Sequence, residues 1–225
     1  MKKKSFASPA DWDHSARVER PAPYSSIYTW YQERLREHGD SHLGVGWPDQ
    51  GKVEVMYQVM LGITQPAAPA SLLDFGCGPA RMLDWMNKTG QWSHLKYTGL
   101  DFNPDSIALA RAKYPAVRFL QRDVLSEPLD EEFDYVVMNG ILTMKAQMTF
   151  EAMWQYAQRL LGCAFAITRR GLAFNVMSKA VDWEKDILFH LPTDMLIDFV
   201  TKNLTRRFVI RQDYAPFEYT VYLYR

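Results

Sequence analysis

The spacing of apolar residues divides the chain near residue 65. Before that point apolar side chains recur at helical spacing, which predicts one helix from about Ser25 to His38 and a second that ends near Gly62. Residues 1 to about 22 carry prolines and charges without any period, so we expect an arm without regular structure there. Together these segments predict an N-terminal arm and helical lid over residues 1–64.

After residue 70, short apolar runs alternate with amphipathic segments, as in parallel strands joined by helices that cover a sheet. The runs predict strands at 72–75, 97–100, 117–120, 135–138, 172–177, 208–212 and 218–224. Because only a turn containing Pro216 separates the last two strands, we expect them to form an antiparallel hairpin. The predicted fold is α/β, with a doubly wound, seven-stranded, mainly parallel, Rossmann-like sheet over residues 65–225. We expect one structural unit.

The fifth strand has two possible positions in the sequence. The segment from Cys163 to Thr168 is apolar enough to be a strand. However, Arg169-Arg170-Gly171 resembles the end of a helix, with basic residues followed by a glycine stop. We therefore predict the strand at Leu172 to Met177.

Composition and charge narrow the functional class. Basic and acidic residues balance at 26 each, which argues against a protein whose main role is to hold duplex nucleic acid or an anionic membrane. Two cysteines cannot build a disulfide framework or a four-ligand zinc site, and the five histidines are dispersed, so we expect no metal site. No apolar run is long enough to span a bilayer, and no secretory signal follows the basic start. We expect a cytoplasmic protein.

A glycine-rich turn follows the first predicted strand. The strand ends in Asp74, and Gly76 and Gly78 lie in the turn that enters the next helix. Glycines remove side chains where a ligand must approach the backbone, and a helix N-terminus offers free N–H groups. Alone, this pattern is also compatible with a tight strand-to-helix turn that has no ligand.

Polar residues end the next three predicted strands as well. Asp101 can accept hydrogen bonds from both ribose hydroxyls of a nucleoside, and Asp123 can accept from an adenine amino group while Val124 packs on the ring. Asn139 ends the fourth strand. Each Asp taken singly is also compatible with a loop or capping residue. Three acids at three successive strand ends would face one crevice, which favours a nucleoside-binding site.

These motifs together resemble those of class I S-adenosylmethionine-dependent methyltransferases. The resemblance covers about residues 71–161 and rests on the segments 74–81, 99–104, 122–124 and 133–137. It implies that the glycine turn meets the methionine part of S-adenosyl-L-methionine, that Asp101 holds the ribose, that Phe102 flanks the adenine and that Asp123 takes its amino group. The residues that we assign to the cofactor are Asp74, Gly76, Cys77, Gly78, Arg81, Asp101, Phe102, Asp123, Val124 and Asn139.

One departure and one rival accompany this resemblance. Ala80 stands where many members of the family have a third glycine, a mild change. NAD-dependent proteins share the topology, but their Gly-x-Gly-x-x-Gly turn would need a glycine at position 81, where this chain has arginine. The acids at 74 and 123 also favour the methyl donor.

The methyl acceptor is less evident from the sequence. Nucleic-acid amino methyltransferases of this fold carry an Asn/Asp-Pro-Pro-aromatic motif after the fourth strand, whereas this chain has Asn139-Gly140-Ile141-Leu142. We therefore expect in-line transfer to an oxygen or nitrogen of a small polar metabolite, without nucleic acid or membrane. A general base is needed only if the acceptor must lose a proton. The candidates are His38 and His190 as base, and Tyr24, Tyr28, Tyr31, Trp47, Asn175 and Tyr214 as acceptor-binding residues.

Two other functions are compatible with the same motifs. One is an RNA or protein methyltransferase whose partner supplies specificity. The other is a protein that binds the cofactor without catalysis and acts as a sensor or interaction partner. The aromatic-rich N-terminal region is also compatible with a homodimer.

Overall fold

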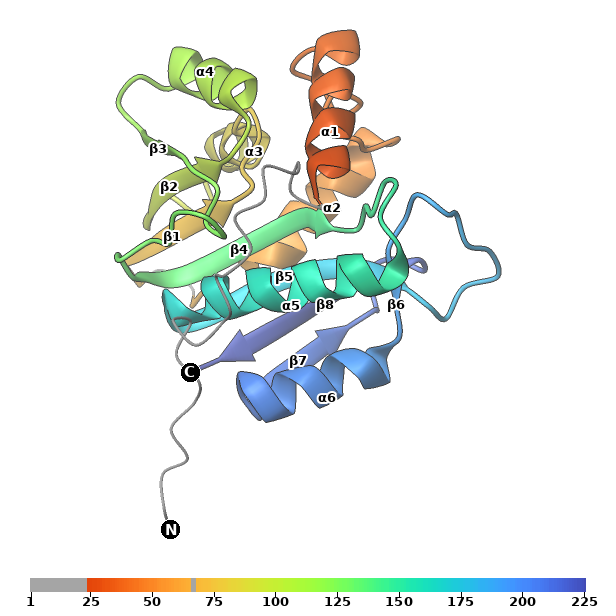
Figure 1. Ribbon diagram of the computed structural model, residues 1–225. Coiled ribbons are helices and arrows are strands. Elements are labelled where there is room, and N and C mark those ends of the chain that lie inside the picture. Colours follow the sequence, from red (N-terminus) through yellow and green to blue (C-terminus); the bar gives the residue numbers. More distant parts are fainter. Residues whose placement is uncertain (1–23, 66–67) are drawn as a thin grey trace.

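A central sheet with helices on both faces forms the protein (Figure 1). The structure, a computed structural model, describes residues 24–65 and 68–225. The arm predicted for residues 1 to 22 lies outside these residues. The helices are α1 (Ser25–His38), α2 (Gln50–Leu61), α3 (Arg81–Thr89), α4 (Pro104–Lys113), α5 (Phe150–Ala166) and α6 (Thr193–Asn203). No helix in the described part of the chain is both long and apolar enough to cross a membrane.

The sheet confirms the predicted α/β fold. Its order is β3-β2-β1-β4-β5-β8-β7, and the first five of these strands run parallel. β8 pairs antiparallel with both β5 and β7, as the predicted hairpin requires. A two-residue strand, β6, is added beside β5. The strands are β1 (Ala70–Phe75), β2 (Leu95–Asp101), β3 (Arg118–Gln121), β4 (Phe133–Leu142), β5 (Thr168–Ser178), β6 (His190–Leu191), β7 (Phe208–Arg211) and β8 (Glu218–Tyr224).

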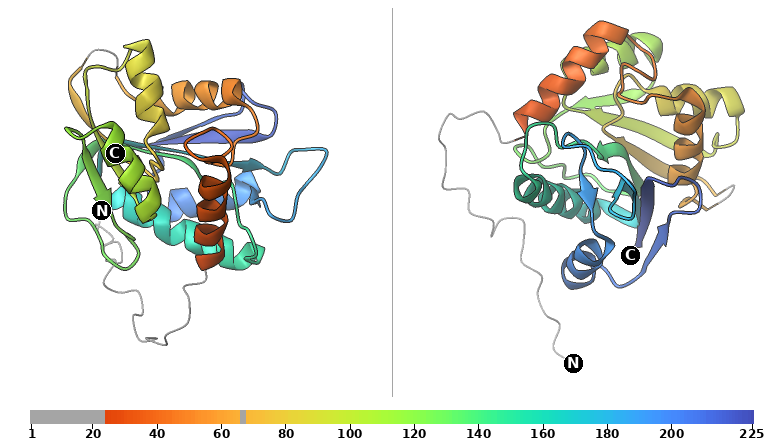
Figure 2. Two further views of the ribbon diagram at one scale, coloured as in Figure 1. Left: turned by 90° about the horizontal axis from the view of Figure 1, so that it is seen from above. Right: turned by 90° about the vertical axis from the view of Figure 1, so that its right-hand side faces the viewer.

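Alternating side chains of the central strands supply two hydrophobic cores. In β1, Leu73 and Phe75 face the core beneath α5 and α6, whereas Leu72 faces the core beneath α2, α3 and α4. β4 alternates in the same way, with Val136 on one face and Val137 on the other. Because both faces are covered, the central strands are continuously apolar. Figure 1 and the turned views of Figure 2 show the helices that cover the two faces of the sheet.

The prediction of a helix end at Arg169-Arg170 is wrong. These residues lie inside β5, which begins at Thr168, and both side chains pair with Asp134 of β4. The last carbonyls of α5 are instead capped by the C-terminal Arg225, whose guanidinium donates to the carbonyls of Phe165 and Ala166. A basic residue distant in the sequence therefore takes the role that the sequence pattern assigned to neighbouring arginines.

The two N-terminal helices have different positions. α2 packs against the sheet, with Val53 and Met60 fully buried in the core. α1 lies across the carboxyl ends of the strands, where its side chains contact the ends of β2 and β4. Tyr24, directly before α1, contacts the loop after β3. A loop over residues 39–49 connects the two helices. α1 and this loop thus cover the edge of the sheet at which the predicted site residues gather.

Candidate functional site

A cavity lies at the carboxyl ends of β1, β2 and β4, beneath α1 and the α1–α2 loop. Its wall contains all ten residues that we assigned to the cofactor. It also contains Tyr24, Tyr31 and Trp47 from the predicted acceptor set. The strand order explains the arrangement, because the ends of β2 and β3 lie on one side of β1 and the end of β4 lies on the other.

The turn after β1 depends on the glycine at position 76. Gly76 has φ +78°, and a Cβ there would lie 2.5 Å from the Ile141 side chain. The N–H groups of Gly76 and Cys77 both donate to the carbonyl of Leu100 in β2, at 2.6 and 2.9 Å. Gly78 also has a positive φ, of +53°. The chain therefore turns tightly here and leaves its backbone at the cavity wall.

Ala80 shows what the missing third glycine costs. It is fully buried and adopts the left-handed conformation, with φ +63° and ψ +38°, directly before α3. An alanine in this region is strained by about 1–2 kcal/mol. Alanine in place of glycine therefore preserves the shape of the turn, although the backbone at Ala80 is strained.

Asp101 is held by backbone N–H groups at the end of β2. One of its carboxylate oxygens accepts from Gly78 at 2.9 Å and the other from Asn103 at 2.8 Å. The side chain is buried, and this burial raises the pKa of the carboxyl, although the backbone hydrogen bonds act in the opposite direction. Asn103 is the N-cap of α4, where its side chain accepts from the N–H groups of Asp105 and Ser106.

Asp74 is the second buried carboxyl of the cavity. Its Oδ2 accepts a hydrogen bond of 2.7 Å from the hydroxyl of Tyr97 in β2. Burial raises the pKa of Asp74 to about 7, against the smaller opposite effect of this hydrogen bond. The carboxyl thus titrates near neutrality, unlike an ordinary surface aspartate.

Two tyrosines of the N-terminal region reach the ends of β2 and β3. The Tyr24 hydroxyl donates to Asp123 at 2.6 Å, and the Tyr24 ring packs on Tyr156 of α5 with centroids 4.9 Å apart. Tyr28 packs against Phe102 at 5.2 Å but does not line the cavity. The polar strand ends on this side are therefore covered by aromatic side chains.

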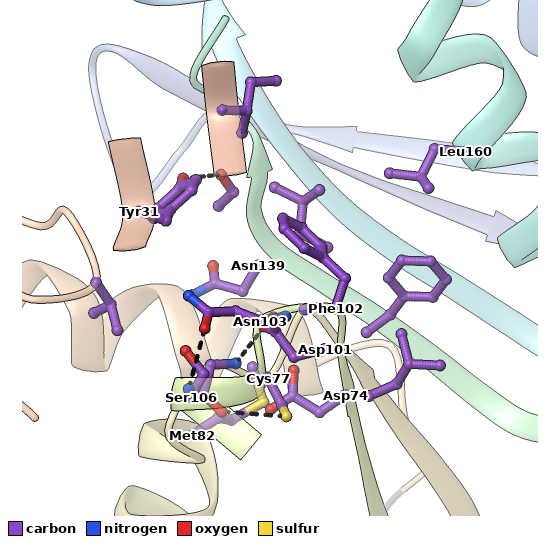
Figure 3. A pocket seen from close by; sticks show the side chains of 18 of the residues that line it. Tyr31, Asp74, Cys77, Met82, Asp101, Phe102, Asn103, Ser106, Asn139 and Leu160 are labelled. Carbon is purple, nitrogen blue, oxygen red and sulfur yellow. Dashed lines mark hydrogen bonds between the residues drawn. The ribbon is translucent and has the colours of Figure 1, made fainter. Parts of the chain in front are cut away.

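The end of β4 forms the opposite wall. Gly140 has φ +82°, its N–H donates to Asn175 at 2.7 Å, and its carbonyl accepts from the Tyr31 hydroxyl at 3.2 Å. A Cβ at Gly140 would lie 3.4 Å from the Trp47 ring. The Oδ1 atom of Asn139 is buried and has no hydrogen-bond partner among the described residues. Figure 3 shows Tyr31, Asn139 and Leu160 among the side chains that line the cavity.

Arg81 joins the α1–α2 loop to the start of α3. Its guanidinium donates to the backbone and side chain of Asp40 and to Gln50, at 3.0 to 3.1 Å. Lys113 of α4 also binds Asp40, at 2.8 Å. The Arg81 Nε atom is buried without a partner in the described part of the chain. These ion pairs hold in place the loop that carries Trp47.

Five predicted site residues lie outside the cavity wall. His38 ends α1 beside Glu37, and His190 lies in β6, where its Nδ1 is 2.7 Å from the Ser178 carbonyl. Neither histidine lines the cavity, so its geometry does not support a role for them as base. The other three residues outside the wall are Tyr28, Asn175 and Tyr214. Asn175 accepts a hydrogen bond from Gly140 behind the wall, and Tyr214 forms a hydrogen bond with Thr220 on another side of the molecule.

The cavity wall also contains residues that the sequence analysis did not assign to the site. Some lie within two positions of a residue assigned to the cofactor and could have been found from that adjacency: Phe75, Met82, Leu100, Asn103, Arg122, Gly140 and Ile141. Others are farther from those motifs and come from helices or from the α1–α2 loop: Ile27, Val45, Tyr57, Ser106, Tyr156 and Leu160.

Comparison with known proteins identifies the family of this core. Residues 72–162 match the family model described as a methyltransferase domain. A Mycobacterium tuberculosis protein with a provisional methyltransferase name is 26% identical over 161 residues, which cover 71% of this chain and 95% of that protein. The trans-aconitate 2-methyltransferase of Methylobacterium nodulans is 34% identical over 76 residues, covering 34% of this chain and 29% of that enzyme.

A solved structure extends the similarity to the whole fold. The 1,6-didemethyltoxoflavin-N1-methyltransferase of Burkholderia thailandensis, bound to 1,6-didemethyltoxoflavin and S-adenosylhomocysteine, superimposes with a TM-score of 0.58 at 20% identity. The match covers 95% of this chain and 97% of that one. The resemblance predicted from the sequence is thereby confirmed: residues 72–162 match a methyltransferase domain, and the chain has the fold of a solved methyltransferase.

Proposed function

We propose that the protein binds S-adenosylmethionine in the cavity and transfers its methyl group to an oxygen or nitrogen of a small molecule. The main support is that one cavity collects the glycine turn after β1 and the polar ends of β2, β3 and β4. Together these segments offer acceptors and donors suited to each part of the cofactor.

The polar groups of the cavity fit the cofactor. Asp101 is already fixed by two N–H groups, and its remaining lone pairs would accept from the ribose hydroxyls. Asp123 would accept from the adenine amino group, with Phe102 and Val124 against the ring. The partnerless Oδ1 of Asn139 suits the ammonium group, and the partnerless Nε–H of Arg81 suits the carboxylate. Unpaired buried polar atoms are costly, so a ligand that satisfies both would be favoured.

The chemical contribution of the protein would be mainly positional. The bound cofactor supplies an electrophilic methyl group on a positively charged sulfur. Tyr31, Trp47 and Gly140 would hold the acceptor beside it and exclude water at the end of β4. Positioning of two reactants in this way can supply roughly 7–11 kcal/mol in well-oriented cases.

A small acceptor suits the enclosed geometry. α1 and the α1–α2 loop cover the strand ends, and the Asp40 ion pairs hold the loop against α3 and α4. The similar Burkholderia thailandensis enzyme was solved with a small heterocyclic molecule bound. Both observations favour a small molecule over a macromolecular acceptor.

Calorimetric titration with S-adenosylmethionine and S-adenosylhomocysteine tests the cofactor part of this proposal. We expect Asp101→Asn to weaken both ligands by more than about tenfold, which corresponds to about 1.4 kcal/mol. The exposed Asp130→Asn, remote from the cavity wall, is the matched control and should bind like the unmodified protein. Absence of binding by the unmodified protein would contradict the proposal.

A labelled-methyl assay tests the acceptor class. Cell extract fractionated into small molecules and macromolecules is incubated with the protein and methyl-labelled cofactor. We expect label in the small-molecule fraction, and its loss in Asp101→Asn. Label that enters only RNA or protein would contradict the small-molecule acceptor while leaving the cofactor site intact.

A further inference from the structure

Charge is distributed unevenly along the cavity. We call the wall formed by Tyr31, Trp47, Gly140 and Ile141 the β4 end. The charged residues of the wall, as far as the structure describes it, are Asp74, Arg81, Asp101, Arg122 and Asp123. Each of them belongs to the ends of β1, β2 or β3 or to the first residue of α3, and so lies in the segments that the proposed function assigns to the cofactor.

Both cations of the wall are engaged away from the β4 end. Arg81 donates through its two terminal nitrogens to Asp40 and Gln50, and only its Nε remains for the cofactor carboxylate. Arg122 follows β3 and donates to the carbonyl of Pro128. Within residues 24–65 and 68–225, the β4 end therefore has no lysine or arginine that could balance a bound carboxylate or phosphate.

The β4 end is instead aromatic and apolar. The Trp47 ring lies against Gly140, where an added Cβ would be 3.4 Å from the ring. The Tyr31 hydroxyl donates its hydrogen bond to the Gly140 carbonyl. Burial raises the pKa of Tyr31, so the side chain is neutral at the β4 end. Aromatic walls bind flat rings well, whereas an unpaired buried charge is strongly disfavoured.

We propose that the methyl acceptor is an uncharged, planar aromatic molecule that binds at the β4 end against Trp47 and Tyr31. This inference rests on the proposed function, since it presumes that the cofactor occupies the other end. A lone pair on the oxygen or nitrogen of the acceptor forms the new bond to the methyl carbon as the carbon–sulfur bond breaks, and the proton of the acceptor leaves to water. S-adenosylhomocysteine is the second product.

The inference separates this chain from one of its relatives. The Methylobacterium nodulans relative is named for trans-aconitate, a small molecule with several carboxylates, and its match covers 34% of this chain. Such an acceptor requires cations beside it. The described β4 end supplies none, so we expect this protein not to bind trans-aconitate.

The test compares two probes that share one ring system and differ in charge. The protein is saturated with S-adenosylhomocysteine and titrated by calorimetry with 2-naphthol, with 2-naphthoate and with trans-aconitate. We expect 2-naphthol to bind more than about tenfold more tightly than 2-naphthoate, and trans-aconitate not to bind. Equal or tighter binding of either carboxylate overturns the inference, and so does failure of 2-naphthol to bind. Failure of S-adenosylhomocysteine itself would instead overturn the proposed function.

Three variants locate the binding. Trp47→Ala should weaken 2-naphthol by more than about fivefold with little change for S-adenosylhomocysteine. Trp92→Ala is the matched control, because Trp92 stacks on Trp85 outside the cavity. Trp47→Lys, compared with Trp47→Ala, places a cation at the β4 end and should shift the preference toward 2-naphthoate. An effect of Trp92→Ala in place of Trp47→Ala, or no shift in Trp47→Lys with an unchanged melting temperature, overturns the inference.

Discussion

The two ends of the cavity are built in different ways. At the ends of β2 and β3, Asp101 and Asp123 are polar, held by nearby N–H groups, and belong to motifs contiguous in the sequence. At the β4 end, Tyr31 and Trp47 come from α1 and the α1–α2 loop and meet Gly140 only in the folded chain. The comparison indicates that the proposed cofactor contacts are encoded in local motifs, whereas the shape of the proposed acceptor site depends on how the N-terminal region packs.

The largest effect is expected where the two ends meet, at Gly76. In Gly76→Ala the new Cβ would lie 2.5 Å from Ile141 of the β4 end, and the residue would keep φ +78°. We expect the free energy of unfolding to fall by about 3 kcal/mol or more and cofactor binding to be lost. Chemical denaturation and calorimetry measure both effects.

Gly90→Ala is the matched control for this substitution. Gly90 has φ +69°, but nothing lies within 4 Å of a Cβ built there. We expect only the conformational strain, about 1–2 kcal/mol, with cofactor binding retained. If the two variants lose equal stability, the contact between Gly76 and Ile141 does not constrain the site.

The next effect concerns pH, because Asp74 in the cavity wall and Glu218 behind the β4 end are buried carboxyls with raised pKa values. Burial raises the pKa of Asp74 to about 7, and it also raises the pKa of Glu218, which binds Asn175 behind the β4 end, to about 7. At a pH between the pKa of these carboxyls in the unfolded chain and their raised pKa in the folded protein, the folded state binds more protons than the unfolded state. The free energy of unfolding should therefore fall as pH rises from about 4 to about 7.

Asp74→Asn and Glu218→Gln should each reduce this fall, by an amount on the order of 2 kcal/mol. Titratable groups near Asp74 are Tyr97, Tyr57, Cys77 and Asp101. Tyr97→Phe removes the hydrogen bond that lowers the pKa of Asp74, so it should extend the fall to higher pH. Denaturation curves across pH measure the slope. A slope unchanged in both carboxyl variants would contradict the assignment.

A smaller and more selective effect is expected for Asn175→Ala. The substitution removes the acceptor for the Gly140 N–H and the donor to Glu218, so it leaves two polar groups behind the β4 end unpaired. We expect a loss of about 1–2 kcal/mol in unfolding free energy. Binding of 2-naphthol should weaken more than binding of S-adenosylhomocysteine. The reverse order would show that the two ends are not energetically separate.

The smallest effect is expected for Ala80→Gly, which restores the glycine that many family members have. Relief of the left-handed strain, about 1 kcal/mol, is offset by the lost burial of one methyl group, worth about 0.8 kcal/mol, so stability should change by less than about 0.5 kcal/mol. Cofactor binding should be unchanged. A loss above about 1 kcal/mol in thermal or chemical denaturation would show that the alanine methyl group is important for packing at this turn.

Local patterns in the sequence determined the sheet and the cofactor motifs. The strand ends at Asp74, Asp101 and Asp123 were predictable because apolar alternation, glycine turns and the Asn103 cap act between neighbouring residues. These features need no information about distant parts of the chain, and every residue assigned to the cofactor from them lines the cavity.

Tertiary structure alone decided the β4 end, the capping of the last turn of α5 and the position of the histidines. Arg225 caps α5 from the far end of the chain. Trp47 contacts Gly140 because the Asp40 ion pairs hold the loop that carries Trp47, and His190 is buried in β6. Contacts of this kind join residues far apart in sequence, and their geometry depends on packing, which no local spacing of apolar residues encodes.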